Sequence, residues 1–282
     1  MSDLYRRLRN TLRYLLGNLN GFKQGDRVAP SAMPELERWV LHRIWELDQT
    51  VRKACDGYDF HGLFRALHDF CAVDLSAFYF DIRKDSLYCD ALDSPRRRAA
   101  QTVLDILFES LTAWLAPILC FTAEEAWLCR FPDTDGSVHL RQFPDVPADW
   151  RDDALAARWE KVRGVRRVVL GALEIERAEK RMGSSLLAAP EVYVDAAYRA
   201  VLDGVDLADV AITSDVTLIE AAPPAGAFTL PDVAGVGVVP KKAEGEKCAR
   251  CWRVLPDVGS IPDVPGVCGR CAEAVQTCRH AA

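Results

Sequence analysis

Two pairs of cysteines near the end of this sequence restrict its fold more than any other feature. Cys248 and Cys251 form one Cys-x-x-Cys pair, and Cys268 and Cys271 form a second, with the 16 residues of 252–267 between them. This spacing is typical of zinc sites. Each pair can place two thiolates on one tight turn, so two turns complete the tetrahedral shell of a structural zinc ion. Such a site leaves no open position for a substrate, so we expect it to hold shape and do no chemistry. Two disulfide bonds are the alternative.

The remaining composition favours zinc over disulfides. The chain has 282 residues, half of them hydrophobic, which is enough to bury more than one core. We find no apolar run long enough to span a bilayer and no signal peptide, so we expect a cytoplasmic protein without a membrane partner. Disulfides are rare in that compartment. We predict that the other cysteines are small buried hydrophobic residues. They are Cys55, Cys71, Cys89, Cys120, Cys129 and Cys278.

The charge of the chain is unevenly distributed along its length. The net charge of −6 argues at first against a nucleic-acid partner. However, residues 1–23 carry five basic side chains against one acidic one, and residues 151–183 carry nine against six. Residues 191–239 are acidic, with eight acidic side chains and one basic one. Two basic segments could therefore receive a polyanion.

The first segment predicts an amphipathic helix. Leu4, Leu8, Leu12 and Leu15 share one face at helical spacing. Arginines at positions 6, 9 and 13 share a roughly opposite face, and we see no acidic partner for them one turn away. This pattern fits phosphate contacts, although a solvated helix face is the alternative.

Hydrophobic periodicity predicts a helical bundle in residues 1–145. Further helices are expected from residue 34 through 51, over 60–82 and over 94–115, and the stretch 60–82 should be the most buried. A capping box of Thr122 and Glu125 predicts a short helix that ends at Cys129.

The second half of the sequence predicts two smaller parts. Residues 146–240 contain a long helix over 152–180 and, from Glu191, segments of period two that indicate a small α/β junction domain. Residues 241–282 form the four-cysteine module. The fold class is therefore mainly α, with a helical bundle, a small α/β domain and a zinc-ribbon or knuckle.

Six sequence blocks resemble one known family. They are YRRLRNTLRYLLGNLNGF at 5–22, ELERWVLHRIWEL at 35–47, YDFHGLFRALHDFCAVDLSAFYFDIRKDSLY at 58–88, APILCFTAEEAW at 116–127, EKRMGSSL at 179–186, and the final CARCW with CGRC. In this order they resemble the C-terminal portion of bacterial isoleucyl-tRNA synthetase, a class I aminoacyl-tRNA synthetase. The resemblance covers essentially the whole chain.

The resemblance implies that the chain binds the anticodon stem and loop of isoleucine tRNA and carries a structural Zn²⁺. RNA loops are bound by aromatic and guanidinium planes and by cations along the phosphates. The residues that could supply these groups are Arg6, Arg9, Asn10, Arg13, Arg177, Lys180, Arg181, Trp252 and Arg253. For Trp252 the alternative is that its ring only covers a module too small to have its own core.

The resemblance also implies limits on what the chain does. The whole enzyme activates isoleucine with ATP in a domain with HIGH and KMSKS motifs and edits misattached valine in another domain. These motifs are absent from this sequence. We therefore expect no catalytic residues and no ATP binding in this chain, which would be monomeric and would act with the catalytic domain of the same synthetase.

Two other functions compete with this interpretation. A zinc-ribbon interaction protein without RNA binding would use the helices as a scaffold. A DNA glycosylase of the formamidopyrimidine type has a similar zinc finger, but it needs proline and glutamate at its mature N-terminus, where this chain has Met1, Ser2 and Asp3.

Overall fold

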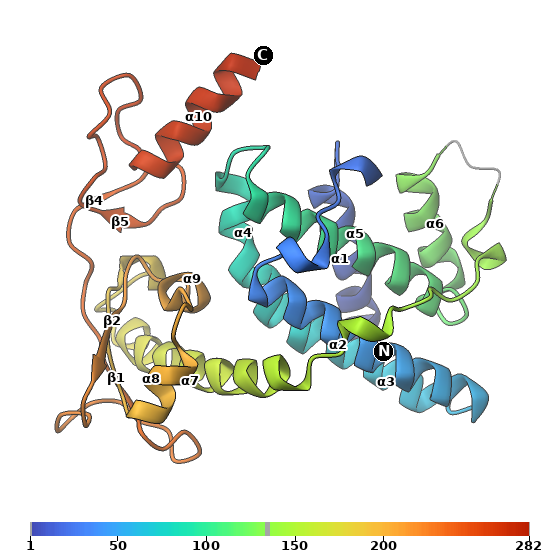
Figure 1. Ribbon diagram of the computed structural model, residues 1–282, viewed down its shortest axis with the longest axis horizontal. Coiled ribbons are helices and arrows are strands. Elements are labelled where there is room, and N and C mark those ends of the chain that lie inside the picture. The colour runs from blue at the N-terminus through green and yellow to red at the C-terminus, as the bar shows by residue number, and fades with distance from the viewer. Residues whose placement is uncertain (1, 133–135, 282) are drawn as a thin grey trace. The chain divides into compact units, whose positions relative to one another are not determined.

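The computed structural model describes residues 2–132 and 136–281. It divides the chain into two compact units, the first formed by Met1–Tyr88 with Leu92–Asp153 and the second by Cys89–Ala91 with Ala154–Ala282. The described residues are mostly helical, with a three-stranded and a two-stranded sheet (Figure 1). The prediction of a mainly α chain with a small α/β part is confirmed, and the division into three domains stays a prediction. No helix in these two described stretches is long and apolar enough to cross a membrane.

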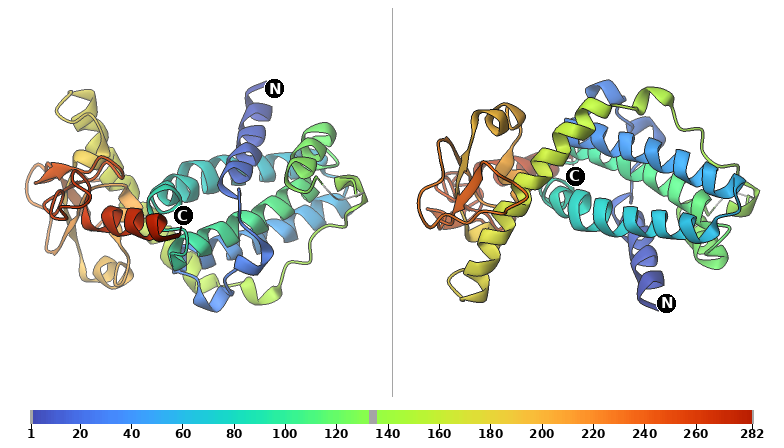
Figure 2. Two further views of the ribbon diagram at one scale, coloured as in Figure 1. Left: turned by 90° about the horizontal axis from the view of Figure 1, so that it is seen from above. Right: turned by 90° about the horizontal axis from the view of Figure 1, so that it is seen from below.

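The first unit is a bundle of α-helices. Its elements are α1 (Ser2–Asn18), α2 (Glu35–Asp56), α3 (Phe60–Asp69), α4 (Phe80–Cys89), α5 (Pro95–Leu115) and α6 (Cys120–Arg130), with short 3-10 turns at Gln24–Asp26, Pro30–Ala32, Val138–Leu140 and Ala148–Trp150. In this unit α5 packs against α1, α2 and α6, and α2 packs against α3 (Figure 2). Three of the four leucines of the predicted apolar stripe of α1 are buried, namely Leu8, Leu12 and Leu15, whereas Leu4 near the start of the helix is 36% exposed.

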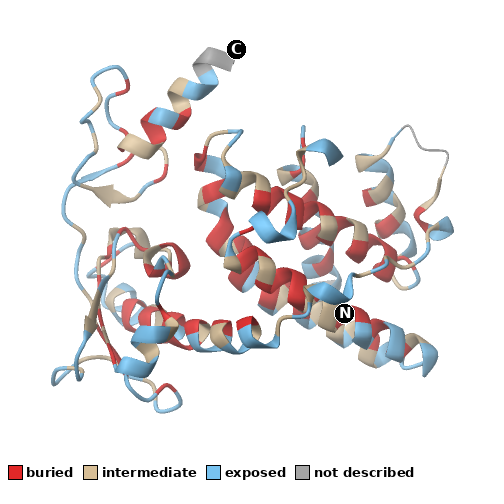
Figure 3. Ribbon diagram, viewed as in Figure 1, coloured by how far each residue is buried: buried red, intermediate tan, exposed pale blue. Residues whose placement is uncertain are grey.

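The most buried helix of the bundle is α5 and not the segment 60–82. From Ala99 to Leu115 every residue of α5 except Ile106 and Glu109 is buried (Figure 3). The segment 60–82 has an outer face that includes Phe60, which is 53% exposed. The prediction was wrong because apolar content measures the affinity of a helix for a core, whereas the number of neighbouring helices decides its burial.

The expected single helix over 60–82 contains a π-helical segment, Phe70–Tyr79. Asp74 lies in this segment with 6% of its surface exposed, and its carboxylate accepts a hydrogen bond from Arg43 Nη2 at 2.9 Å. A π turn changes which residues face the core, and a pattern based on 3.6 residues per turn cannot indicate it.

The start of α6 differs from the predicted capping box. The helix begins at Cys120, and its N-cap residue is Leu119, whose side chain cannot cap. Thr122 is therefore inside the helix, where its Oγ1 lies 3.0 Å from the hydroxyl of Tyr5 on α1. The tertiary contact with α1 engages the hydroxyl group that the sequence pattern assigned to capping.

Three of the six cysteines outside the two Cys-x-x-Cys pairs are exposed, although all six were predicted to be buried. Cys71 and Cys89 are buried and Cys55 is half-buried, whereas Cys120, Cys129 and Cys278 are exposed. The two exposed cysteines of α6 follow from its packing, because this helix buries only two alanines, Ala123 and Ala126, among its described residues.

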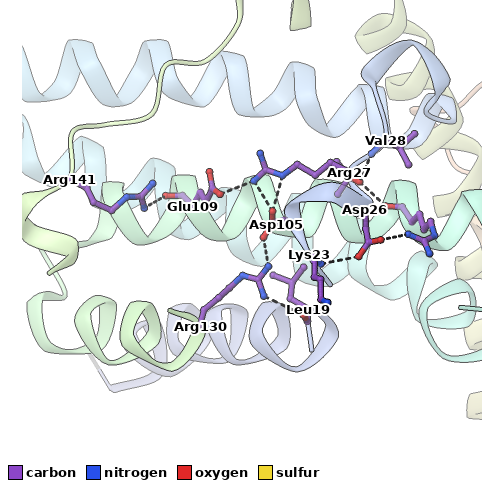
Figure 4. Close-up of polar contacts among 11 residues, drawn as sticks. Leu19, Lys23, Asp26, Arg27, Val28, Asp105, Glu109, Arg130 and Arg141 are labelled. Atoms are coloured by element: carbon purple, nitrogen blue, oxygen red, sulfur yellow. Dashed lines mark hydrogen bonds and ion pairs between the residues drawn. The ribbon is translucent and has the colours of Figure 1, made fainter. Parts of the chain in front are cut away.

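A buried ionic network holds the segment after α1 and the end of α6 to α5. The carboxylate of Asp105 accepts hydrogen bonds from Arg27 Nη2 at 2.6 Å and from Arg130 Nη2 at 2.5 Å (Figure 4). Arg27 Nη2 also donates to Glu109 Oε1 at 2.7 Å. Arg141 donates to the backbone oxygen of Glu109 at 3.1 Å. Opposite charges thus compensate one another around the buried carboxylate of Asp105, whose side chain is 5% exposed, whereas Arg27 and Glu109 at the edge of the network reach solvent.

The second unit combines a long helix, two small sheets and short helices. Its elements are α7 (Asp153–Ala178), β1 (Glu191–Val194), α8 (Ala196–Val201), α9 (Leu207–Ala211), β2 (Thr217–Glu220), β3 (Val236–Val239), β4 (Glu246–Lys247), β5 (Val254–Leu255) and α10 (Gly269–Ala281), with a 3-10 turn at Ser185–Leu187. In the larger sheet β1 pairs in parallel with β2 and antiparallel with β3. Alternate residues of β1, Val192 and Val194, are buried, which confirms the period of two.

Candidate metal centre and nucleic-acid interface

The four predicted cysteine ligands come together in the second unit. The sulfur atoms of Cys248, Cys251, Cys268 and Cys271 all lie within 4.8 Å of one another, and all four residues are buried. The Sγ atoms of Cys251 and Cys268 are 3.8 Å apart. A tetrahedron with zinc–sulfur bonds of about 2.3 Å has edges of about 3.8 Å, so the separation of Cys251 and Cys268 is that of two zinc ligands.

The first pair of cysteines sits on the turn between β4 and β5. The backbone oxygen of Cys248 accepts a hydrogen bond from Trp252 N at 3.0 Å, and the N–H of Cys248 donates to Arg253 O at 2.8 Å. Just before this turn, Gly245 has φ +114°, and a Cβ atom at this position would lie 2.4 Å from the backbone of Leu255. Only glycine allows the two chain segments to approach so closely.

The second pair sits at the start of α10. The N–H of Cys268 points at the sulfur of Cys248, with 3.4 Å between nitrogen and sulfur. The N–H of Gly269 donates to Asp257 Oδ2 at 2.8 Å, which caps the first turn of the helix. The first pair is therefore held by backbone hydrogen bonds of its own turn, and the second by hydrogen bonds to Cys248 and Asp257, so that two elements distant in sequence meet at one point.

The thiols of the cluster have raised pKa values, so binding of a cation must be coupled to loss of their protons. The hydrogen bond with Cys271, together with burial, raises the pKa of Cys251 to about 12. Burial is also the main cause that raises the pKa of Cys268. Without a cation these thiols stay protonated, whereas a divalent ion stabilises the thiolates that bind it. Four buried sulfurs fill the coordination shell, so the centre can stabilise structure but has no position for a reacting water.

Trp252 projects from this centre into solvent. Its φ of +66° lies in the left-handed region, which non-glycine residues rarely adopt, and 61% of its surface is exposed. Lys247 Nζ lies 5.8 Å from the centre of the Trp252 ring, within the range of a cation–π contact. The pair presents an aromatic plane and a positive charge side by side. Sequence reasoning missed Lys247, although its position directly before the first cysteine, beside a tryptophan on the same turn, could have indicated it.

Arg253 lies differently from its neighbour Trp252. Its side chain is 16% exposed, and its Nη2 lies 3.4 Å from Asp209 Oδ1, whose side chain is 7% exposed. The guanidinium group is therefore engaged inside the second unit, and the structure separates two residues that the sequence placed in one surface.

The basic residues at the end of α7 are exposed but have acidic neighbours. Arg177 lies 2.9 Å from Glu174, and Arg181 lies 2.6 Å from Glu176. The hydrogen bond from Arg181 lowers the pKa of Glu176. Lys180 is exposed as well and has φ +58°, so the chain turns sharply here. The pair of Arg177 and Glu174 is well exposed, whereas Glu176 is only 16% exposed; both arginines remain about half exposed and accessible to an anion.

The predicted residues of α1 are all exposed in the first unit. They are Arg6, Arg9, Asn10 and Arg13. Contrary to expectation, two of the arginines have acidic partners: Arg6 contacts Asp3 one turn away, and Arg9 lies 3.7 Å from Glu125 of α6. Arg9 and Arg13 also line a groove of about 290 Å³ between α1 and α6. The acidic partner on α6 could not be read from the sequence of α1.

Comparisons with known proteins agree with these features. Residues 37–192 match the family described as the anticodon-binding domain of tRNA ligase, and residues 245–274 match the zinc finger found in FPG and IleRS. The chain is 56% identical over 275 residues to an isoleucine–tRNA ligase of Brucella abortus and 57% identical over 277 residues to one of Ruegeria pomeroyi. These alignments cover 97% and 98% of this chain but 28% of each relative. The four-cysteine cluster is a structural zinc site.

Proposed function

Because this chain belongs to the family of anticodon-binding domains of tRNA ligases, we propose that it binds the anticodon stem and loop of isoleucine tRNA. The exposed aromatic ring of Trp252, beside Lys247 on the zinc-bound turn, is the observation that carries this proposal. A stacking plane next to a cation suits an unstacked base and its phosphate.

The basic residues of both units supply the phosphate contacts in this proposal. Arg6, Arg9, Asn10 and Arg13 act from α1, and Arg177, Lys180 and Arg181 act from the end of α7. Arg253 serves indirectly, because its guanidinium group faces Asp209. RNA phosphates displace the weak ion pairs of these arginines, because a polyanion offers several negative charges at once.

The whole synthetase supplies the chemistry in this proposal. Its catalytic domain binds ATP and attaches isoleucine to the tRNA, and this chain positions the tRNA for that reaction. We expect the chain to be cytoplasmic and monomeric and to have no activity alone. Isoleucine-dependent pyrophosphate exchange by the pure chain would contradict this.

A fluorescence titration with two RNAs tests the proposal. One is the isoleucine tRNA transcript, and the other is the same transcript with a swapped anticodon. We expect tight binding that is largely lost on swapping. The logarithm of the binding constant should fall with the logarithm of salt concentration with a slope of about −3 if about four phosphates are contacted.

Equal affinity for the two transcripts would contradict anticodon recognition. Affinity that does not change with salt would contradict the phosphate contacts, and it would favour a zinc-ribbon protein that binds another protein.

A further inference from the structure

A single buried hydroxyl group connects three segments of the second unit. Ser214 follows α9 and is 4% exposed. Its Oγ donates a hydrogen bond to Leu186 O at 2.5 Å and accepts one from Val254 N at 2.7 Å. The N–H of Ser214 donates to Ala188 O at 3.0 Å. Ser214 therefore holds the 3-10 turn Ser185–Leu187 and strand β5 at a fixed separation.

The two segments that Ser214 connects carry the proposed RNA contacts of this unit. The turn Ser185–Leu187 begins four residues after Arg181, and Lys180 and Arg181 follow the last residue of α7, Ala178. Val254 is two residues from Trp252 and pairs in the β4–β5 ladder with Lys247. The hydroxyl group thus links the segment that follows Lys180 and Arg181 to the strand that follows the aromatic platform, which is Trp252 with Lys247.

The backbone around Ser214 is shaped to bring it there. Ile212 has φ +57°, which ends α9 and turns the chain inward, so that Thr213 and Ser214 are both buried. A parallel link comes from Asp209 in α9, which faces Arg253. The two residues that follow Trp252 in sequence are therefore both attached to the segment 209–214.

We propose that Ser214 is a positioning residue for RNA binding. If the chain binds RNA as proposed above, Ser214 fixes the distance between Trp252 and the cationic residues that follow α7. A surface that is already arranged for its ligand binds more tightly than one that must be ordered during binding. Loss of the hydroxyl group frees the turn that carries Trp252, whereas the four cysteines keep their zinc because none of them contacts Ser214 through the hydrogen bonds described.

Two hydroxyl deletions next to each other provide the test. Ser214→Ala removes the bridging group. Thr213→Val removes an equally buried hydroxyl group whose hydrogen bond to Ala208 O is long, at 3.5 Å, and stays within its own turn. With the full chain and labelled isoleucine tRNA, we expect Ser214→Ala to weaken binding about tenfold and Thr213→Val less than about twofold. Both variants should keep their zinc content.

A double-mutant cycle with Trp252→Ala separates positioning from folding. If Ser214 acts through the platform, Ser214→Ala should weaken binding less than about threefold in the Trp252→Ala background, because coupled residues are not additive. A full tenfold loss in that background would overturn the inference, and so would loss of zinc from Ser214→Ala. If Ser214→Ala does not fold, Asp209→Asn takes its place, because it weakens the contact between Asp209 and Arg253. It is combined with Trp252→Ala in the same double-mutant cycle.

The binding data distinguish failure of the positioning role from failure of the proposed function. If wild type does not distinguish the two anticodons, the proposed function fails. If wild type does distinguish them while Ser214→Ala binds as wild type does, only the positioning role is overturned.

Discussion

Replacing Asp105 with asparagine keeps the size of the side chain but removes the negative charge that Arg27 and Arg130 share. Asp105 is 3% exposed, and its oxygens accept three hydrogen bonds, two from Arg27 and one from Arg130 (Figure 4). Burial lowers the pKa of Arg27, but its contacts with Asp105 and Glu109 outweigh this effect and raise the pKa overall. In the variant both guanidinium groups stay charged and lose their common partner.

The expected loss of stability is about 3 kcal/mol. Removing one partner of a buried ion pair costs about 3–5 kcal/mol. Arg27 contributes less to this cost, because it is 28% exposed to water and keeps its contact with Glu109 at 2.7 Å. Arg130 contributes more, because it is only 13% exposed. We therefore take the lower end of the range. For a unit of about 150 residues this corresponds to a fall in Tm of about 6–12 °C.

Thermal unfolding followed by far-UV circular dichroism measures this change. The matched control is Asp26→Asn, which removes the charge of a carboxylate 2.6 Å from Arg98. The side chain of Asp26 is 32% exposed and that of Arg98 is 35% exposed. We expect the control to cost less than about 1 kcal/mol, because exposed pairs contribute little. A Tm of Asp105→Asn no lower than that of Asp26→Asn would refute the claim that the buried network stabilises the bundle.

Three further predictions concern the metal, the platform and a buried thiol. Cys251→Ser should bind zinc only weakly while the bundle melts as before, since metal binding supplies the folding free energy of the module; unchanged zinc content by atomic absorption would contradict the site. Trp252→Ala should weaken tRNA binding about 5- to 150-fold, from about 1–3 kcal/mol per stacked base, and Trp252→Phe much less; equal affinities of all three proteins would exclude stacking. Burial raises the pKa of Cys71 from 9.0 to about 12, so above pH 9 the unfolded chain loses this proton first and stability falls as pH rises towards 12. Urea titrations should show that between pH 9 and pH 12 the free energy of unfolding of Cys71→Ala falls less steeply than that of the wild type. The same pH dependence in both proteins would contradict the prediction.

Much of the fold could be predicted because it follows from short-range patterns. The helix expected over 94–115 has a proline in its first turn and ends before another proline, and in the structure it spans Pro95–Leu115 with Ser94 as its N-cap. The two Cys-x-x-Cys spacings likewise identify the four ligands from short stretches of sequence. The π-helical segment around Asp74 and the true start of α6 at Cys120 could not be predicted, because contacts with other helices decide them.

The sequence by itself determined the helical bundle, the zinc ligands and the family. Periodicity and spacing are properties of residues close together in the chain, so they can be read without knowing what those residues contact. The tertiary structure alone decided that Trp252 adopts a left-handed conformation beside Lys247, while Arg253 faces Asp209. It also decided that Ser214 joins residues 28 positions before it and 40 positions after it. Such contacts depend on how distant segments pack, and packing is a property of the whole folded unit.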